Sequence, residues 1–197
     1  MILKKFTSFD AGFTVGVSAM LKIVFIIVLV ITVCILIYAF MRPDSFSVVR
    51  QLKIDAVPEK VFAEVNDFNR WKFWSPWETK DPAMQRKFSG ASVGVGTIYE
   101  WNGNKDVGRG RMEITESDVP KKIIIKLDFF KPFEAHNIAD FTFTKEGEGT
   151  LVTWEMRGPQ AFMSKLICIF MDMDKMVGNN FEAGLNTMKK LAETNSN

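Results

Sequence analysis

With 197 residues, the chain has room for one ordinary domain and a short accessory segment, which excludes two full domains. Its 25 basic residues barely outnumber its 23 acidic residues. Three Lys and one Asp precede residue 23, so the rest of the chain is neutral. We therefore expect no nucleic-acid partner, because phosphate binding requires a clustered excess of Lys and Arg. One His and two distant Cys also exclude a disulfide framework and a Cys/His zinc site.

The first predicted element is an apolar helix. From Ile23 to Met41 no residue carries a formal charge, and as a helix this run would extend about 28 Å, close to the roughly 30 Å hydrocarbon core of a bilayer. A buried core helix would keep a polar stripe, which this run lacks. A cleaved signal peptide is the stronger alternative, although its apolar region is usually about 7 to 15 residues long. We predict a transmembrane helix over residues 20–42, in contact with the bilayer through residues 21–41.

The charges around this helix predict its orientation. Lys4, Lys5 and Lys22 precede it with only Asp10 against them, so the positive-inside rule places residues 1–19 in the cytoplasm as a polar segment. The chain is then a single-pass membrane protein whose domain, residues 43–197, lies on the extracytoplasmic side. Met20 is an alternative start, which would remove most of this N-terminal charge.

Alternating apolar residues predict the body of the domain. A first strand has the alternating residues Phe46, Val48, Leu52, Ile54 and Ala56 on one face. Pro58 then suits the first turn of a short helix that ends near Asp67. Six further strands, separated by turn residues, are expected at 84–89, 96–101, 107–117, 123–130, 135–145 and 150–157. Their short connections favour an antiparallel meander. A helical period returns from Phe162 to Glu193, with a break expected either near Gly178 or just before Asp172.

This order of elements, together with three motifs, resembles a known superfamily. The motifs are the segment 54–62 (IDAVPEKVF), the Trp-rich segment 69–77 (NRWKFWSPW) and the strand 150–154 (TLVTW). They resemble the START/Bet v 1-like superfamily, also labelled SRPBCC or polyketide cyclase, in its bacterial branch with an N-terminal membrane helix. The resemblance implies an α+β helix-grip fold: an antiparallel curved sheet of about seven strands wrapped around a long C-terminal helix, preceded by one transmembrane helix. It also implies an apolar cavity between sheet and helix.

A set of residues in the expected inward register is predicted to line this cavity. Gly110 leaves space there and methionine adapts to varied ligands, although a plainly packed core explains the same pattern. Arg50 shares the register and either grips a ligand anion or forms a strand-end salt bridge. The predicted ligand-binding residues are Arg50, Ile98, Gly110, Met112, Ile114, Phe141, Phe143, Trp154, Met156, Phe170, Met173, Val177 and Phe181. The tryptophans at 71, 74 and 77 either pack in the core or rest in the bilayer interface.

The sequence predicts no catalytic residue, no metal site and no cofactor. His136 is out of phase with Phe141 and Phe143, so it should point away from them. Residues two apart on a helix lie about 200° apart, so Asp172 and Asp174 cannot face one substrate. A general base at Asp128 or Glu100 would require that side chain to point inward.

Three functions remain open from the sequence. The first is membrane-anchored binding of a hydrophobic or amphipathic small molecule, lipid-like or aromatic, in an internal cavity. The second is an enzyme resembling the polyketide cyclases and aromatases, in which the pocket orients a reactive chain. The third is a protein-interaction module with a filled core. The sequence does not define the ligand or the oligomeric state.

Overall fold

The computed structural model describes the backbone of residues 7–194 and the side chains of residues 19–194. Lys4 and Lys5, on which the predicted orientation depends, lie outside the described residues, as does the side chain of Asp10. The described chain forms two structural units. One comprises the N-terminal helix with residues 162–170, and the other comprises residues 43–161 with the chain from Met171 onward.

The first unit consists of two helices. Helix α1 (Thr7–Met41) is long, and its segment Ala19–Met41 is apolar and long enough to cross a membrane. This segment is almost entirely exposed, which argues against a buried core helix and leaves a membrane span or a signal sequence. Helix α4 (Phe162–Phe170) packs against α1.

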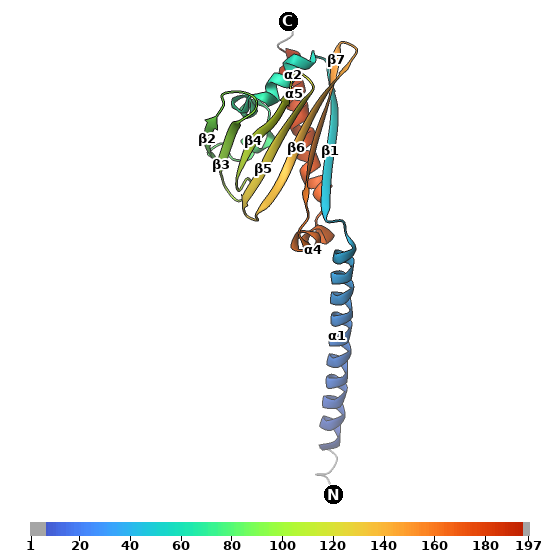
Figure 1. Cartoon of the computed structure of the whole chain (residues 1–197). Coiled ribbons are helices and arrows are strands. Elements are labelled where there is room, and N and C mark those ends of the chain that lie inside the picture. Colours follow the sequence, from blue (N-terminus) through green and yellow to red (C-terminus); the bar gives the residue numbers. More distant parts are fainter. Residues whose placement is uncertain (1–6, 195–197) are drawn as a thin grey trace. The chain divides into compact units, whose positions relative to one another are not determined.

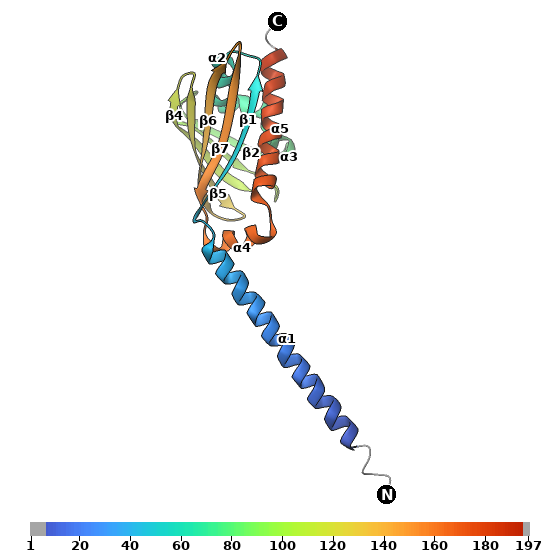
Figure 2. The same cartoon turned by 90° about the vertical axis from the view of Figure 1, so that its right-hand side faces the viewer.

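The second unit is a curved antiparallel sheet with helices on one face (Figures 1 and 2). Its strands follow the order β1-β7-β6-β5-β4-β3-β2, so β2 to β7 form a meander and β1 closes onto β7. This confirms the predicted helix-grip fold. The strands are β1 (Ser45–Ile54), β2 (Gln85–Gly90), β3 (Thr97–Asn102), β4 (Arg109–Asp118), β5 (Lys122–Lys131), β6 (Ala135–Glu146) and β7 (Gly149–Pro159). The helices are α2 (Pro58–Asn66), η1 (Phe68–Phe73), α3 (Pro76–Lys80) and α5 (Met173–Thr194).

Local sequence explains where these helices begin and end. Pro58 and Pro76 occupy the first turns of α2 and α3, where a missing N–H costs nothing. The predicted break before Asp172 is confirmed, because α4 ends at Phe170 and α5 begins at Met173. The Asp172 carboxylate accepts a hydrogen bond from the Lys175 backbone N–H at 3.1 Å, which satisfies a free donor of the first turn of α5.

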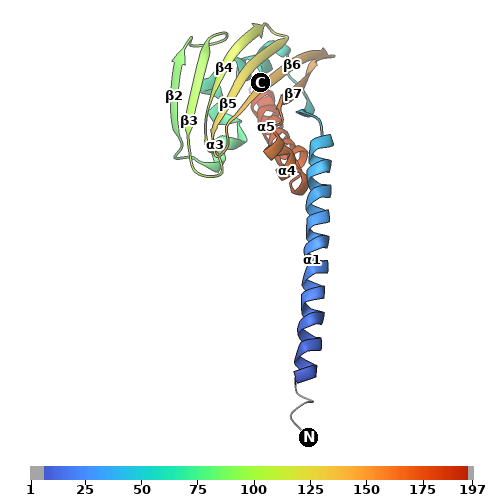
Figure 3. The ribbon, with the colours of Figure 1, turned by 60° about the horizontal axis from the view of Figure 1, so that its bottom comes forward.

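The sheet curves around α5, which Figure 3 shows foreshortened beneath the strands. The buried face of α5 meets the inward residues of the strands, and the largest fully buried side chains include Trp74, Phe141, Phe181 and Leu185. Near α2 this core is densely filled: Phe62 packs edge-on against Phe143, with ring centroids 5.3 Å apart. Toward the beginning of α5 the filling is incomplete, and a cavity remains.

Candidate functional site

The cavity lies between α5, the inward face of the sheet and the η1–α3 segment. Its volume is about 240 Å³, and it is partly open to solvent. Its wall is mainly aromatic, aliphatic and methionine side chains. The lining residues are Trp71, Ser75, Trp77, Glu78, Lys80, Met84, Tyr99, Trp101, Asp106, Val107, Met112, Leu127, Phe129, Ala139, Trp154, Met156, Met176, Val177, Asn180 and Phe181. A site of this composition suits an apolar ligand with few polar groups.

Trp154 of β7 anchors the aromatic part of the wall. Its ring stacks on Phe181 of α5 with centroids 4.0 Å apart and on Phe141 at 4.8 Å. Trp77 packs edge-on against Trp154 at 5.9 Å. Trp71 and Trp74 are buried and donate their indole N–H groups to backbone carbonyls of α2. The three tryptophans of the Trp-rich segment therefore pack against the domain core, as the first of the two sequence interpretations predicted.

Two polar residues of the wall, Glu78 and Tyr99, belong to a hydrogen-bonded group of three side chains. The Tyr99 hydroxyl donates to Glu78 Oε1 at 2.8 Å, and Arg86 lies 2.6 Å from Glu78 Oε2. Burial of the phenol, reinforced by the Glu78 carboxylate, raises the pKa of Tyr99. The hydrogen bond from Arg86 to Glu78 likewise raises the pKa of the guanidinium. At neutral pH this wall therefore presents a protonated phenol beside an ion pair.

Five of the thirteen predicted ligand-binding residues line the cavity. They are Met112, Trp154, Met156, Val177 and Phe181, and their role in binding remains a prediction. Three others, Ile114, Phe141 and Phe143, point inward but lie in the packed part of the core, where they are almost fully buried. Inward register alone did not separate them from the cavity, because the same face of the sheet also packs against α2.

Two residues on β3 and β4 occupy positions that differ from those expected. Ile98 alternates with the buried Thr97 and Tyr99, so it points to the opposite face of the sheet, and the predicted register of β3 was wrong by one residue. Gly110 does point inward, but the ring of Trp101 covers it, and an added Cβ would also lie 2.5 Å from the Asp128 carbonyl. The ring of Trp101, a wall residue of the cavity, therefore fills the space that this glycine leaves.

Arg50 forms a salt bridge, which was the alternative to a contact with a ligand anion in the sequence analysis. Its Nη2 lies 2.9 Å from Asp174 and its Nε 2.7 Å from Glu182, both on α5. The absence of a side chain at Gly178 lets the guanidinium approach the helix backbone. Met173, half-buried, is the first residue of α5. Phe170 belongs to α4 in the other structural unit and is exposed.

Sequence reasoning missed much of the cavity wall, including the contributions of α3, β3 and β5. Tyr99 and Trp101 alternate on β3, and Leu127 and Phe129 alternate on β5. The alternation of large aromatic residues at 99 and 101 was the available signal. The contribution of Glu78 had no signal in the sequence, because it depends on how α3 folds against the sheet.

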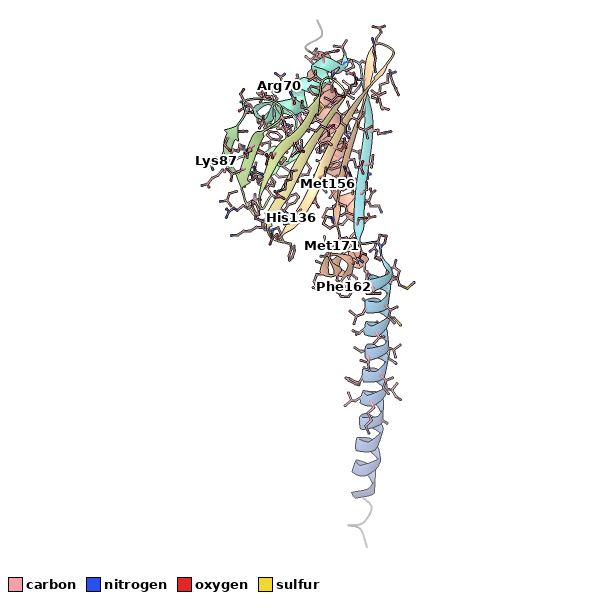
Figure 4. The ribbon with its side chains drawn as sticks, in the orientation of Figure 1. Arg70, Lys87, His136, Met156, Phe162 and Met171 are labelled. Atoms are coloured by element: carbon pink, nitrogen blue, oxygen red, sulfur yellow. The ribbon has the colours of Figure 1, made fainter. Side chains whose placement is uncertain are left out.

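The titratable residues considered as catalytic candidates lie on the opposite face of the sheet. Asp128 alternates with the wall residues Leu127 and Phe129, and its carboxylate lies 2.7 Å from His136 Nδ1. The hydrogen bond to Asp128 raises the pKa of His136, which Figure 4 labels near the start of β6. Glu100 forms an ion pair with Lys87 across β2 and β3 at 2.8 Å. Neither carboxylate therefore faces the cavity.

These ion pairs form part of a row of alternating charge across five strands. Lys87, Glu100, Arg111, Asp128 and His136 are successive cross-strand neighbours from β2 to β6. Opposite charges at directly opposed positions stabilise a sheet modestly. The row therefore has a structural explanation. Among residues 19–194, no three His, Cys, Asp or Glu side chains are placed to hold a metal ion.

Solved structures share this fold. Protein CV1439 from Chromobacterium violaceum has a TM-score of 0.54 and 14% identity over 77% of this chain and 99% of that chain. The Aha1 dimer from Colwellia psychrerythraea has a TM-score of 0.55 and 16% identity over 77% of this chain and 99% of that chain. The di-domain ARO/CYC BexL from the BE-7585A biosynthetic pathway has a TM-score of 0.55 and 15% identity over 80% of this chain and 53% of that chain. At these identities the similarities show the fold alone.

The family comparison covers most of the chain. No curated protein matches the sequence. Residues 45–193 match the family described as polyketide cyclase / dehydrase and lipid transport. This range takes in the sheet, the Trp-rich segment and nearly all of α5. The chain therefore belongs to the polyketide cyclase / dehydrase and lipid transport family.

Proposed function

We propose that this protein binds a hydrophobic or amphipathic small molecule in the cavity of a domain that α1 anchors to a membrane. The observation that carries the proposal is the cavity of about 240 Å³ with its aromatic and methionine wall. An apolar cavity of about 150 Å³ is large enough to bind benzene, so this one suits a larger apolar group. A ligand that buries about 200 Å² of apolar surface would gain about 5 kcal/mol before the cost of its immobilisation.

The wall composition favours a flat or partly aromatic ligand with at least one polar substituent. Trp77 and Trp154 offer ring surfaces, and methionines such as Met112 adapt their shape to the ligand. The Tyr99–Glu78–Arg86 group supplies polar atoms on one side. Anchoring through residues 21–41 would give the domain direct access to molecules dissolved in the bilayer.

Native mass spectrometry of the full chain, released from membranes of its expression host, tests this proposal. A stoichiometric apolar adduct that organic extraction recovers is expected. The substitution Met112→Trp should fill the cavity and abolish the adduct. The matched control is Phe133→Trp, because Phe133 is an exposed residue between β5 and β6 that does not line the cavity. An adduct of equal occupancy in the parent and in Met112→Trp would place the ligand elsewhere.

The second candidate function is an enzyme of the cyclase type. The specific observation that favours it is Tyr99, whose hydroxyl stays protonated at the cavity wall and donates its proton to Glu78. If the hydroxyl turns from Glu78 toward a ligand, it can donate a hydrogen bond to that ligand instead. The substitution Tyr99→Phe removes the hydroxyl and keeps the ring. An enzyme would lose turnover of the recovered ligand and keep its binding, whereas a pure binding protein would show no turnover in either form. The interaction-module alternative required a filled core, and the volume of the cavity argues against it.

A further inference from the structure

Helix α4 carries an apolar face that points away from α1. Met163, Ile167 and Phe170 follow a helical spacing of four and three residues, which places them on one side of α4. Met163 is 65% exposed and Phe170 is 77% exposed, and Phe162, labelled in Figure 4, lies at the start of the same helix. In water, such a surface would be unfavourable because its apolar area stays hydrated.

The charged residue of α4 points in the other direction. Lys165 is buried, and its Nζ donates a hydrogen bond to the Arg42 carbonyl at 2.8 Å. Arg42 in turn donates from Nη1 to the Cys168 carbonyl at 2.8 Å, which satisfies an acceptor in the last turn of α4. These reciprocal hydrogen bonds attach α4 to the end of α1, and Ala39 is fully buried there.

The attachment point fixes the level of α4 relative to the apolar segment. The segment Ala19–Met41 ends immediately before Arg42, and Phe40 and Met41 in its last turn are largely exposed. If this segment spans a bilayer, Arg42 lies where hydrocarbon gives way to headgroups. Helix α4 has nine residues and a length of about 13 Å, so its whole apolar face is held close to that boundary.

We propose that α4 is an interfacial helix that inserts the face formed by Phe162, Met163, Ile167 and Phe170 into the bilayer surface beside the end of α1. This inference rests on the proposed membrane anchoring. The bilayer is the favoured occupant because the face carries no charge and belongs to a helix attached at the apolar end of α1, whereas protein contact surfaces usually have a polar rim. The inserted helix would add a second membrane contact outside the spanning segment.

Fluorophore depth in vesicles tests this inference with the full chain. In a Cys34→Ser, Cys168→Ser background, single cysteines replace Met163 and Phe170 and receive an environment-sensitive dye. Quenching is measured with phosphatidylcholine vesicles that contain a doxyl lipid labelled either near the headgroup or deep in the acyl chain, and separately with aqueous iodide. Ile27→Cys within α1 reports on the span, and Val119→Cys, in the turn between β4 and β5, is a control of nearly equal exposure to Met163, at 63%.

Strong doxyl quenching and weak iodide quenching at 163 and 170, relative to 119, are expected. Iodide quenching at 163 and 170 equal to that at 119, with position 27 still quenched by deep doxyl lipids, would overturn the inference and leave the anchoring intact. Blue-shifted emission at 163 and 170 without doxyl quenching would identify a protein occupant and also overturn it. Loss of lipid quenching at position 27 would overturn the proposed anchoring itself.

Discussion

Enlarging a side chain in the cavity should be tolerated, whereas the same change in the packed core should not. Ala139 on β6 lies between Ile125 of β5 and Met156 of β7 and faces the cavity. The substitution Ala139→Leu adds three carbon atoms, whose transfer from water is worth about 2 kcal/mol. Because the cavity provides space, little of this gain is lost to overpacking. We expect the melting temperature of the domain to stay the same or to rise.

The matched substitution is Ala192→Leu on α5. Ala192 is also fully buried, but it lies in the packed part of the core. Extra carbon atoms in a filled core usually cost about 1 to 3 kcal/mol. For a domain of this size the melting temperature should fall by roughly 2 to 12 °C. The assay is thermal unfolding of the full chain in detergent, monitored through the near-UV circular dichroism signal of its buried tryptophans.

The reasoning is refuted if Ala139→Leu and Ala192→Leu lower the melting temperature equally, because the space beside Ala139 would then be filled in solution. The same variant also tests binding. With less free volume, Ala139→Leu should take up less of the ligand recovered from the parent, while its near-UV spectrum stays unchanged. Undiminished uptake would argue that the ligand occupies another part of the protein.

Three further predictions concern the polar wall and the sheet. Glu78→Gln should lower the raised pKa of Tyr99 while burial keeps it above its usual value of about 10, as measured by phenolate absorbance against pH. Asp128 raises the pKa of His136, so their stabilisation is fully present below about pH 6.5 and is lost as pH rises through the folded pKa. The melting temperature of the parent should therefore exceed that of His136→Gln more at about pH 6 than at about pH 9, and an equal difference at both would contradict the pairing. Gly110→Ala should cost about 1 to 3 kcal/mol or more in thermal unfolding, because its Cβ would meet a tryptophan ring and a carbonyl oxygen; an unchanged melting temperature would disprove this contact.

The predicted strands and helices agree with the structure within about two residues at most boundaries, because the signals that define them are local. The alternation of apolar residues indicated that each strand has one buried face. Proline marked the starts of α2 and α3. The antiparallel order of β2 to β7 followed from the short turns between them. On β3 this reasoning failed, because Ile98 and Tyr99 are both suited to a buried face and local alternation did not identify the inward one.

The candidate site was predicted less completely than the fold. A residue such as Phe141 in the packed core and a residue such as Met156 at the cavity have the same inward register. Their difference depends on which helix covers them. Glu78 approaches Tyr99 only because α3 folds back over the sheet, which is a contact between residues 21 positions apart.

The sequence by itself determined that this protein has an apolar N-terminal segment and a neutral domain of antiparallel strands and helices, because charge, hydropathy and period are properties of each segment alone. The helix-grip arrangement of these elements was implied by the resemblance to a known superfamily. The tertiary structure decided where the domain is hollow. It also decided that Arg50 joins β1 to α5 and that Lys165 turns toward α1 and leaves an apolar face on α4. Packing between distant segments fixes these features, and the pattern within one segment carries no record of its neighbours.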